Sequence, residues 1–396
     1  MHPAVAQAER FGAHNYHPLD VVLVRGAGAW VTDSEGRRYL DCLSAYSALN
    51  QGHCHPRIIA ALHDQAGRIT LSSRAFHNDK LGPFLQQLCE LSGFDRALVM
   101  NSGAEAVETA IKAARKWAYQ VKGVRDGAAE IVVAADNFHG RTTTVVSAST
   151  EPQYRAGFGP FTPGFKVVPF GDVAATRAAI GPNTAAVLVE PIQGEAGIRV
   201  PPDDWLPALR AACDEAGCLL ILDEIQTGFG RTGKMFDFLH SGIRPDGITV
   251  GKALGGGVLP VSAFLASEQV MNVFEPGDHG STFGGNPLAC AVGRAALDVL
   301  VDERLAERAQ QLGTWFRDEL RALNSRHVVE VRGRGLLIGL EIAASSGPAL
   351  PFCLAAKDRG LLCKDTHGSV IRLAPPLIAD RDALGFALGV LREVLA

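Results

Sequence analysis

Residues 219–226, Leu-Leu-Ile-Leu-Asp-Glu-Ile-Gln, join a short apolar run to a pair of carboxylates. An unbroken apolar run of this length is typical of a strand that is buried on both faces of a sheet. Polar residues directly after such a strand lie at the carboxyl edge of the sheet, where doubly wound folds bind their ligands. The stretch therefore predicts a parallel sheet and, at its end, a functional site.

Comparable apolar runs lie on both sides of this stretch. They alternate with helical patterns such as residues 104–121, where apolar residues recur at spacings of three and four. The expected strands are Ala97–Met100, Ile131–Ala135, Ala185–Val189, Leu219–Leu222, Gly247–Val250 and Ser262–Ala266. This alternation predicts an α/β fold with a mostly parallel, doubly wound central sheet.

The two ends of the chain are expected to form a second, smaller α+β domain. A long helical pattern at Arg294–Leu323 leads into apolar runs at Val328–Val331 and Leu336–Glu341. Residues Trp30–Asp41 have the pattern of a hairpin with its turn at residues 34–36. Because a short hairpin cannot stand alone, it should pack with the C-terminal part. The expected units are an N-terminal segment at 1–52, a large domain at 53–290 and a small C-terminal domain at 291–396.

The composition excludes several classes of function. The chain has 396 residues, of which 47% are hydrophobic and 20% charged, an ordinary globular balance. Its formal net charge of -4 offers no basic face for nucleic acid or an anionic membrane. The sequence has no apolar run long enough to span a membrane, and its first residues lack the pattern of a signal peptide. We expect a soluble protein that binds neither nucleic acid nor membrane.

Eight cysteines are scattered singly, without a Cys-x-x-Cys pair. This usage is typical of a reducing compartment, so we expect a cytoplasmic protein. His53-Cys54-His55 is the one cluster that suggests a metal. No second ligand pair follows it at finger-like spacing, and we expect no metal site.

A phosphate-binding turn is predicted within residues 100–107, Met-Asn-Ser-Gly-Ala-Glu-Ala-Val. There a strand ends, a turn of small residues follows, and a long helix begins. Free N–H groups at a helix start, with a glycine beside them, can bind a phosphate. An ordinary helix cap by Ser102 explains the same residues. The stretch alone leaves both interpretations open.

A single lysine stands in residues 249–257, Thr-Val-Gly-Lys-Ala-Leu-Gly-Gly-Gly. Lys252 follows an apolar strand and precedes three glycines, which allow a bulky group to approach the backbone closely. A lysine becomes a nucleophile when desolvation or nearby cations lower its pKa. A surface lysine beside a flexible loop is the alternative for this stretch alone.

The three stretches together are what pyridoxal phosphate requires of a protein: a phosphate site, a carboxylate for the ring nitrogen and a Schiff-base lysine. An acidic pair after a strand also fits nucleotide hydrolysis, but that chemistry needs a Gly-x-x-x-x-Gly-Lys-Ser/Thr loop, which the sequence lacks. A dehydrogenase would need Gly-x-Gly-x-x-Gly after an early strand, which is also missing. A non-catalytic phosphate-binding module of Rossmann type is the remaining alternative from a different class.

In these stretches the chain resembles the fold-type I, class III aminotransferases, which depend on pyridoxal phosphate. The similarity extends over nearly the whole chain, and residues 360–376, Gly-Leu-Leu-Cys-Lys-Asp-Thr-His-Gly-Ser-Val-Ile-Arg-Leu-Ala-Pro-Pro, are most similar to the bacterial ornithine δ-aminotransferase branch. Further matching stretches are residues 43–56, 73–79, 136–142, 157–161, 190–197 and 279–287.

The resemblance implies a set of cofactor contacts. Lys252 matches the Schiff-base lysine, which also carries the proton, and Asp223 matches the partner of the pyridine nitrogen. Gln226 matches the residue near the ring hydroxyl, with Ile225 and Phe138 against the two ring faces. The implied phosphate contacts are Ser102, Gly103, Ala104 and, from the neighbouring subunit, Thr282. The last of these implies a homodimer with active sites at its interface.

The resemblance also implies how substrates are bound. Arg372 matches the arginine that binds the α-carboxylate of 2-oxoglutarate, and Arg141 the one that binds the ornithine α-carboxylate or the oxoglutarate γ-carboxylate. Glu195 matches a glutamate that pairs with Arg372 and screens it while ornithine reacts. Tyr46 and His77 match further substrate contacts, although animal members carry tyrosine at the position of His77 and tryptophan at that of His139. Without the family, each arginine would equally suit an ordinary ion pair.

The implied reaction transfers the δ-amino group of L-ornithine to 2-oxoglutarate by a ping-pong mechanism. Its products are glutamate and glutamate 5-semialdehyde, which cyclises to pyrroline-5-carboxylate. The nearest alternatives within the class are N-acetylornithine and N-succinylornithine aminotransferases, followed by another ω-aminotransferase such as one for 4-aminobutyrate. Residues 360–376 and Tyr46 favour free ornithine.

Overall fold

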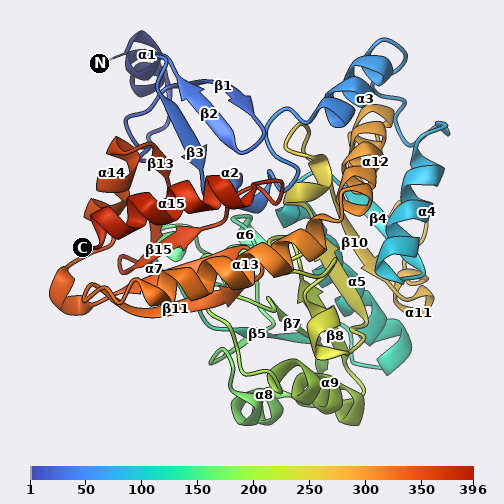
Figure 1. Cartoon of the computed structure of the whole chain (residues 1–396). Coiled ribbons are helices and arrows are strands. Elements are labelled where there is room, and N and C mark those ends of the chain that lie inside the picture. Colours follow the sequence, from blue (N-terminus) through green and yellow to red (C-terminus); the bar gives the residue numbers. More distant parts are fainter. Residues whose placement is uncertain (1) are drawn as a thin grey trace.

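The computed structural model describes residues 2–396 (Figure 1). Its centre is a seven-stranded sheet in which six strands are parallel and β10 runs antiparallel to both of its neighbours. In spatial order the strands are β4 (Arg96–Met100), β10 (Ser262–Ala266), β9 (Gly247–Val250), β8 (Leu219–Asp223), β7 (Thr184–Val189), β5 (Glu130–Ala134) and β6 (Phe165–Val168).

Six of these strands are those predicted from the apolar runs, and the mostly parallel, doubly wound sheet is confirmed. The seventh, β6, is not predicted by the sequence pattern. It is an edge strand of four residues that include Lys166, and most of it is only half-buried or exposed. An edge strand covered on one side lacks the unbroken apolar run that identifies its central neighbours.

The central strands are buried on both faces, as their sequences predict. In β8, Leu219 and Ile221 belong to the hydrophobic cluster that includes α5 (Gly103–Trp117). The alternate residue Leu220 belongs to the cluster on the opposite face, which includes α9 (Trp205–Ala216). Successive side chains of a strand point to opposite faces, so only an apolar residue at every position satisfies both clusters.

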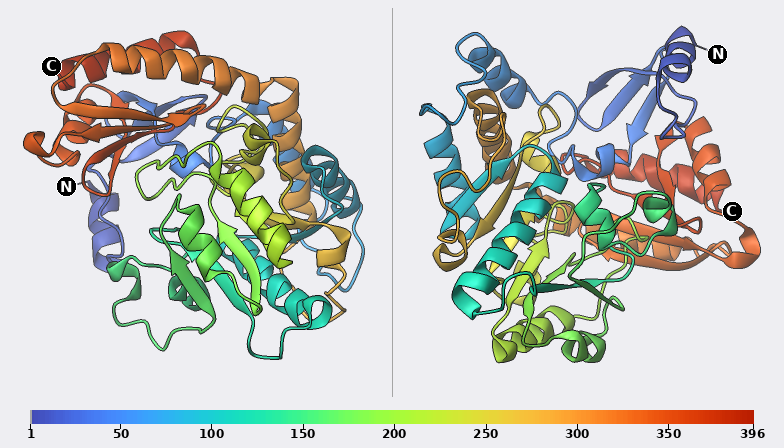
Figure 2. Two further views of the ribbon diagram at one scale, coloured as in Figure 1. Left: turned by 90° about the horizontal axis from the view of Figure 1, so that it is seen from below. Right: turned by 180° about the vertical axis from the view of Figure 1, so that it is seen from behind.

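The smaller unit contains both ends of the chain, which lie on the same side of the molecule in both views of Figure 2. β2 (Trp30–Asp33) and β3 (Arg38–Asp41) form the predicted hairpin, and β3 pairs in parallel with β13 (Leu361–Leu362). β1 (Leu23–Ala27) completes this four-stranded sheet. A second four-stranded sheet has the order β11 (Val328–Arg334), β12 (Leu337–Ile342), β15 (Val370–Leu373) and β14 (Lys364–Thr366).

The prediction of one continuous helix at Arg294–Leu323 is wrong. The structure has two helices there, α12 (Pro287–Asp302) and α13 (Leu305–Ala322), separated at Arg304, whose backbone is left-handed with φ 51°. The apolar spacing continues across the break, so periodicity alone does not reveal it. α12 packs on α3 and α4 of the large unit, whereas α13 packs on β11 and α15 of the smaller one. The break therefore separates a helix that contacts the large unit from a helix that contacts the smaller one (Figure 1).

Shorter elements connect these parts. The remaining helices are α1 (Pro3–Phe11), α2 (Ser44–Ser47), α3 (Pro56–Ala66), α4 (Leu81–Ser92), α6 (Thr143–Ser147), α7 (Pro152–Arg155), α8 (Val173–Ala179), α10 (Phe238–Ser241), α11 (Glu268–Met271), α14 (Leu350–Asp358) and α15 (Arg381–Val394). Between residues 2 and 396, no helix is both long enough and apolar enough to pass through a lipid bilayer.

Candidate active site

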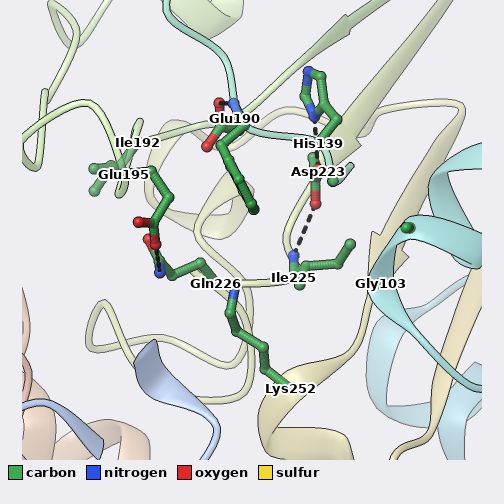
Figure 3. A pocket seen from close by; sticks show the side chains of 12 residues that line it. Gly103, His139, Glu190, Ile192, Glu195, Asp223, Ile225, Gln226 and Lys252 are labelled. Carbon is green, nitrogen blue, oxygen red and sulfur yellow. Dashed lines mark hydrogen bonds and ion pairs between the residues drawn. The ribbon is translucent and has the colours of Figure 1, made fainter. Parts of the chain in front are cut away.

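A cavity of about 190 Å³ lies at the carboxyl ends of the parallel strands, where the sequence predicts the site (Figure 3). β8 ends with Asp223, Lys252 follows β9 with one glycine between, and Glu190 follows β7. Eight of its lining residues are those predicted from the sequence: Gly103, Ala104, Phe138, Glu195, Asp223, Ile225, Gln226 and Lys252.

Asp223 is a buried carboxylate of the cavity, with 4% of its surface exposed. Its Oδ1 accepts hydrogen bonds from the Thr249 hydroxyl at 3.0 Å and the Ile225 amide at 3.1 Å. Its Oδ2 lies 2.7 Å from Nδ1 of His139, which is also buried. Burial opposes protonation of His139, but the hydrogen bond and the charge of Asp223 outweigh it and raise the pKa of the imidazole. The hydrogen bond to the Asp223 carboxylate thus favours the protonated form of the His139 imidazole.

Lys252 extends into the cavity from the turn after β9 (Figure 3). Its backbone is left-handed with φ 45°, a conformation that a non-glycine residue adopts only when its surroundings enforce it. Burial lowers the pKa of its amine, and the charge of Arg372 lowers it further, against the opposing effects of Glu195 and Asp223. A lysine with a lowered pKa has more of the neutral amine that acts as nucleophile or base.

The start of α5 fits both interpretations of its sequence, the helix cap and the phosphate site. The Ser102 hydroxyl accepts from the Glu105 amide at 3.2 Å, and the Glu105 carboxylate accepts from the Ser102 amide at 2.7 Å. Ser102 therefore caps the helix, as the ordinary explanation predicts. Gly103 and Ala104 line the cavity at the positive end of the helix dipole, where an anion is stabilised.

Arg372 and Glu195 form an ion pair at the edge of the cavity. Arg372, on β15, has 2% of its surface exposed, and its two terminal nitrogens donate to the Glu195 carboxylate at 2.7 and 3.3 Å. Gln226 also donates to this carboxylate, at 3.2 Å. Burial opposes ionisation of Glu195, but Arg372 lowers the pKa of its carboxyl below the ordinary value. The guanidinium of Arg372 lies over the Tyr46 ring, 4.8 Å from its centroid.

Arg141 has a different environment. Its side chain is exposed and forms no ion pair with any residue between 2 and 396. Its guanidinium carbon lies 4.1 Å from the centroid of the Tyr154 ring and 5.7 Å from that of Phe138. One of the two predicted substrate arginines is thus neutralised by a carboxylate, and the other is a free cation.

Six predicted residues do not line the cavity of their own chain. Ser102 and Arg141 directly adjoin lining residues in the sequence. Tyr46 and Arg372 are hydrogen-bonded to Gln226 and Glu195, which line it. The other two are farther from it. His77 and Thr282 are both exposed, and neither lines it. The segment that carries Thr282 is held against α5 by His279, whose Nε2 lies 2.7 Å from the Thr109 hydroxyl. In the cluster that suggested a metal, His53 bonds to Asp41 at 2.8 Å and His55 to Glu303 at 3.0 Å, so the two imidazoles have separate carboxylate partners.

The cavity includes residues that were not predicted as part of the site: His139, Gly140, Glu190 and Ile192. Glu190 directly follows the buried strand β7, so the rule that identified Asp223 could have found it. It accepts the Phe138 amide at 3.0 Å, and burial raises its pKa to about 8. Glu190 therefore holds the backbone of the Phe138 segment mainly as a neutral acid near pH 7.

Comparison with known proteins gives one consistent family. The family model described as Aminotransferase class-III matches residues 11–395. The ornithine aminotransferase of Brevibacillus brevis is 55% identical over 391 residues, which cover 99% of this chain and 97% of that protein.

Solved structures agree with this result. The crystal structure of ornithine aminotransferase from Toxoplasma gondii ME49 superposes with a TM-score of 0.97 at 45% identity, covering 99% of this chain and 94% of that one. Acetylornithine aminotransferase from Elizabethkingia anophelis superposes with a TM-score of 0.89 at 48% identity, covering 99% and 98%. The chain belongs to the class-III aminotransferase family.

Proposed function

We propose that this protein transfers the δ-amino group of L-ornithine to 2-oxoglutarate by a ping-pong mechanism. The products are glutamate and glutamate 5-semialdehyde, which cyclises to pyrroline-5-carboxylate. The observation that carries this proposal is the contrast between the two arginines: Glu195 neutralises Arg372, while Arg141 is free of any ion pair among residues 2–396. The names of relatives such as the Brevibacillus brevis enzyme support it.

The contrast decides which amine of ornithine reacts. An unpaired Arg372 would bind the α-carboxylate and bring the α-amine to Lys252. With Arg372 paired, the carboxylate of ornithine binds at Arg141, and the δ-amine at the other end of the molecule reaches Lys252. A carboxylate and a guanidinium form a strong two-point contact, which gives this choice its specificity. In the second half-reaction 2-oxoglutarate brings two carboxylates, and Glu195 must leave Arg372 so that both arginines bind substrate.

The residues of the cavity fit pyridoxal phosphate, the cofactor of this family. A structure of the Toxoplasma gondii enzyme is described with this cofactor at its active site. The helix start at Gly103 and Ala104 suits the phosphate, and the buried carboxylate of Asp223 suits a protonated ring nitrogen. When bound, pyridoxal phosphate supplies an aldehyde for the amine and a ring that takes up the electron pair of the broken C–H bond.

The side chains supply the remaining chemistry. Asp223 would keep a proton on the ring nitrogen, because a carboxylate at hydrogen-bond distance favours the protonated form of its partner. Ile225 and Phe138 would hold the two faces of the ring, and Gln226 would lie toward its hydroxyl. Lys252 would hold the cofactor covalently at rest, and its amine, once free, would serve as the base and acid that carries the proton.

We further propose that the protein is a homodimer in which Thr282 binds the phosphate of the neighbouring site and His77 lies near that substrate. The exposure of both residues in their own chain supports this arrangement. Mixing subunits tests it. Lys252→Ala and Thr282→Ala dimers should each be impaired, and random mixing should restore about one quarter of wild-type activity, since each hybrid dimer has one intact site. Activity that stays at the average of the two parents contradicts the shared site.

The proposed domain division is 1–52, 53–290 and 291–396, with the first segment packed on the last. The pairing of β3 with β13 supports that packing. We also propose a cytoplasmic location, which is supported by the free thiols of all eight cysteines.

The test of the function is a comparison of ornithine with N-acetylornithine, each with 2-oxoglutarate. We expect pyrroline-5-carboxylate from ornithine, trapped with 2-aminobenzaldehyde, and at least tenfold lower kcat/KM for N-acetylornithine. The 48% identity to an acetylornithine aminotransferase makes acetylated ornithine the second candidate. The reverse preference would establish that candidate, and no glutamate from either donor would contradict both.

A further inference from the structure

Tyr154 lies beside the cavity and has no role in the proposed function. It belongs to α7, and its ring is closer to Arg141 than that of Phe138 is, with the Arg141 guanidinium carbon 4.1 Å from its centroid. The same ring meets Phe138 edge-on, with centroids 5.9 Å apart and planes at 78°. Tyr154 thus contacts both a predicted carboxylate-binding residue and a residue predicted to cover the cofactor ring.

Hydrogen bonds from the next residue hold the backbone of Tyr154 in place. Arg155, the next residue, donates from one guanidinium nitrogen to the carbonyl oxygens of Val146, Ser147 and Ser149 at 3.1, 2.9 and 3.1 Å. These carbonyls lie at and after the end of α6. Arg155 therefore clamps α7 onto α6.

The backbone next to Arg141 is also held by α6. α6 begins immediately after Arg141, with Thr142 as its cap. The Thr142 hydroxyl donates to the Glu108 carboxylate at 2.5 Å, which ties the start of α6 to α5. The backbones of Arg141 and Tyr154 thus belong to one connected set of hydrogen bonds, and their side chains meet from opposite ends of it.

The contact is attractive and leaves Arg141 available. The face of the Tyr154 ring attracts the guanidinium cation. Burial raises the pKa of the Tyr154 hydroxyl, against the opposing effect of the Arg141 charge. Stacking on a ring uses the flat face of the guanidinium and leaves the N–H groups at its edge for a carboxylate. A long side chain held in this way also loses less conformational freedom when a substrate binds.

We propose that Tyr154 is a positioning residue that holds the Arg141 guanidinium ready for the substrate carboxylate. Through its edge contact with Phe138 it also ties the carboxylate site to the cover of the cofactor ring. This inference rests on the proposed function, in which Arg141 binds the substrate carboxylate. Removing the aromatic face should weaken carboxylate binding, whereas removing only the hydroxyl should not.

The test measures binding of glutarate, an unreactive five-carbon dicarboxylate, to the holoenzyme by calorimetry. We expect Tyr154→Leu to raise the Kd for glutarate about 5- to 20-fold, the range of a cation–π contact in a partly desolvated place. Tyr154→Phe should stay within about twofold, because it keeps the ring. Tyr119→Leu removes a half-buried ring in the short helical segment Ala118–Lys122 that follows α5 and should leave the Kd unchanged. KM for ornithine should rise more than kcat falls in Tyr154→Leu.

A double-mutant cycle separates positioning from a general effect on folding. In an Arg141→Ala background, Tyr154→Leu should cause no further loss of glutarate binding, because the residue that Tyr154 positions is gone. Full additivity of the two losses overturns the proposal, and so does an equal loss in Tyr154→Phe and Tyr154→Leu. If Tyr154→Leu does not fold, Tyr154→Met takes its place in the same cycle.

The glutarate measurement does not depend on the amino donor. Wild-type protein that binds glutarate but makes no pyrroline-5-carboxylate would contradict the proposed function and leave the Tyr154 comparison intact.

Discussion

Glu195 and Arg372 meet through two hydrogen bonds, of 2.7 and 3.3 Å, between the loop that follows β7 and strand β15. The guanidinium is almost fully buried, whereas part of the carboxylate faces the cavity. The Glu195 backbone is held separately, because the Thr366 hydroxyl donates to its carbonyl oxygen at 2.5 Å. The side chain of Glu195 can therefore turn away from Arg372 while its backbone stays in place.

Replacing Glu195 should change which amine of ornithine reacts. In Glu195→Ala the unpaired Arg372 competes for the α-carboxylate, so we expect the ratio of δ- to α-amine transfer to fall about tenfold, the equivalent of about 1.4 kcal/mol. The measurement is the ratio of pyrroline-5-carboxylate to the isomeric product of α-amine transfer. Glu195→Gln retains the shape without the charge and should lie between the two. An unchanged ratio in Glu195→Ala would show that the pair does not direct the substrate.

Lys252 should be required for both colour and turnover. Lys252→Ala removes the amine that binds the cofactor and moves the proton, so the visible band of the bound cofactor should shift or disappear. Transamination should fall by about 1,000-fold or more, because loss of a group that moves a proton alone costs 10²–10⁴-fold. Lys234→Ala, at an exposed lysine, is the matched control. A Lys252→Ala variant that keeps the wild-type spectrum would show that Lys252 does not bind the cofactor, whereas wild-type protein without any visible band would support the non-catalytic phosphate-binding module.

The bond between His139 and Asp223 should make stability depend on pH. The pKa of His139 is raised in the folded protein, so the stabilisation is fully present below the unfolded pKa of about 6.5 and is lost as pH rises through the folded pKa. In the cofactor-free protein, His139→Gln should therefore lower the melting temperature most at acid pH, and the difference should narrow as pH rises. Thermal unfolding at a series of pH values measures it. A difference that widens with pH would mean that His139 is neutral in the fold.

Gly194 should tolerate no side chain. A Cβ at this position would lie 1.3 Å from Oε1 of Gln226, so Gly194→Ala must displace the amide that donates to Glu195. We expect faster loss of cofactor during dialysis, followed by absorbance, and a melting temperature lower by several degrees. In Gly181→Ala the new Cβ would meet no atom within 4 Å, and this control should behave like wild type. If the two variants lose cofactor at the same rate and melt at the same temperature, the position of Gln226 does not affect cofactor binding or stability.

The sequence predicts the centre of the fold because a strand that is buried on both faces has a recognisable, unbroken apolar sequence. Strands such as β8 are apolar at every position, and a functional residue at the end of such a strand, as Asp223 is, can be located without knowing the rest of the chain. Edge strand β6 lacks this pattern, because the sequence of a half-buried strand resembles that of a loop. The helix break at Arg304 is also hidden, because the apolar spacing continues across it as in one helix.

The substrate side of the site was predictable only through resemblance to a family. Contacts such as Arg372 with Glu195 join residues 177 positions apart, and no local pattern encodes them. Tyr46 reaches Arg372 from a run of left-handed residues, Ser44–Ser47, with φ between 45° and 70°, which few sequence rules would assign to non-glycine residues. The roles of His77 and Thr282 remain predictions, because they concern a second subunit.

The parallel pairing of β3 with β13 has a consequence for synthesis of the chain. Leu40 leaves the ribosome long before its partner Leu361, which is 321 positions (361 − 40) later in the chain. The sheet that begins with β1 therefore has an open edge while nearly the whole chain is being made. The large unit, whose strands all lie between residues 96 and 266, can fold during this time. Completion of the smaller unit must wait for synthesis of β13, so a chain that is truncated or stalled before β13 would expose the unpaired edge of β3 and should be prone to aggregation.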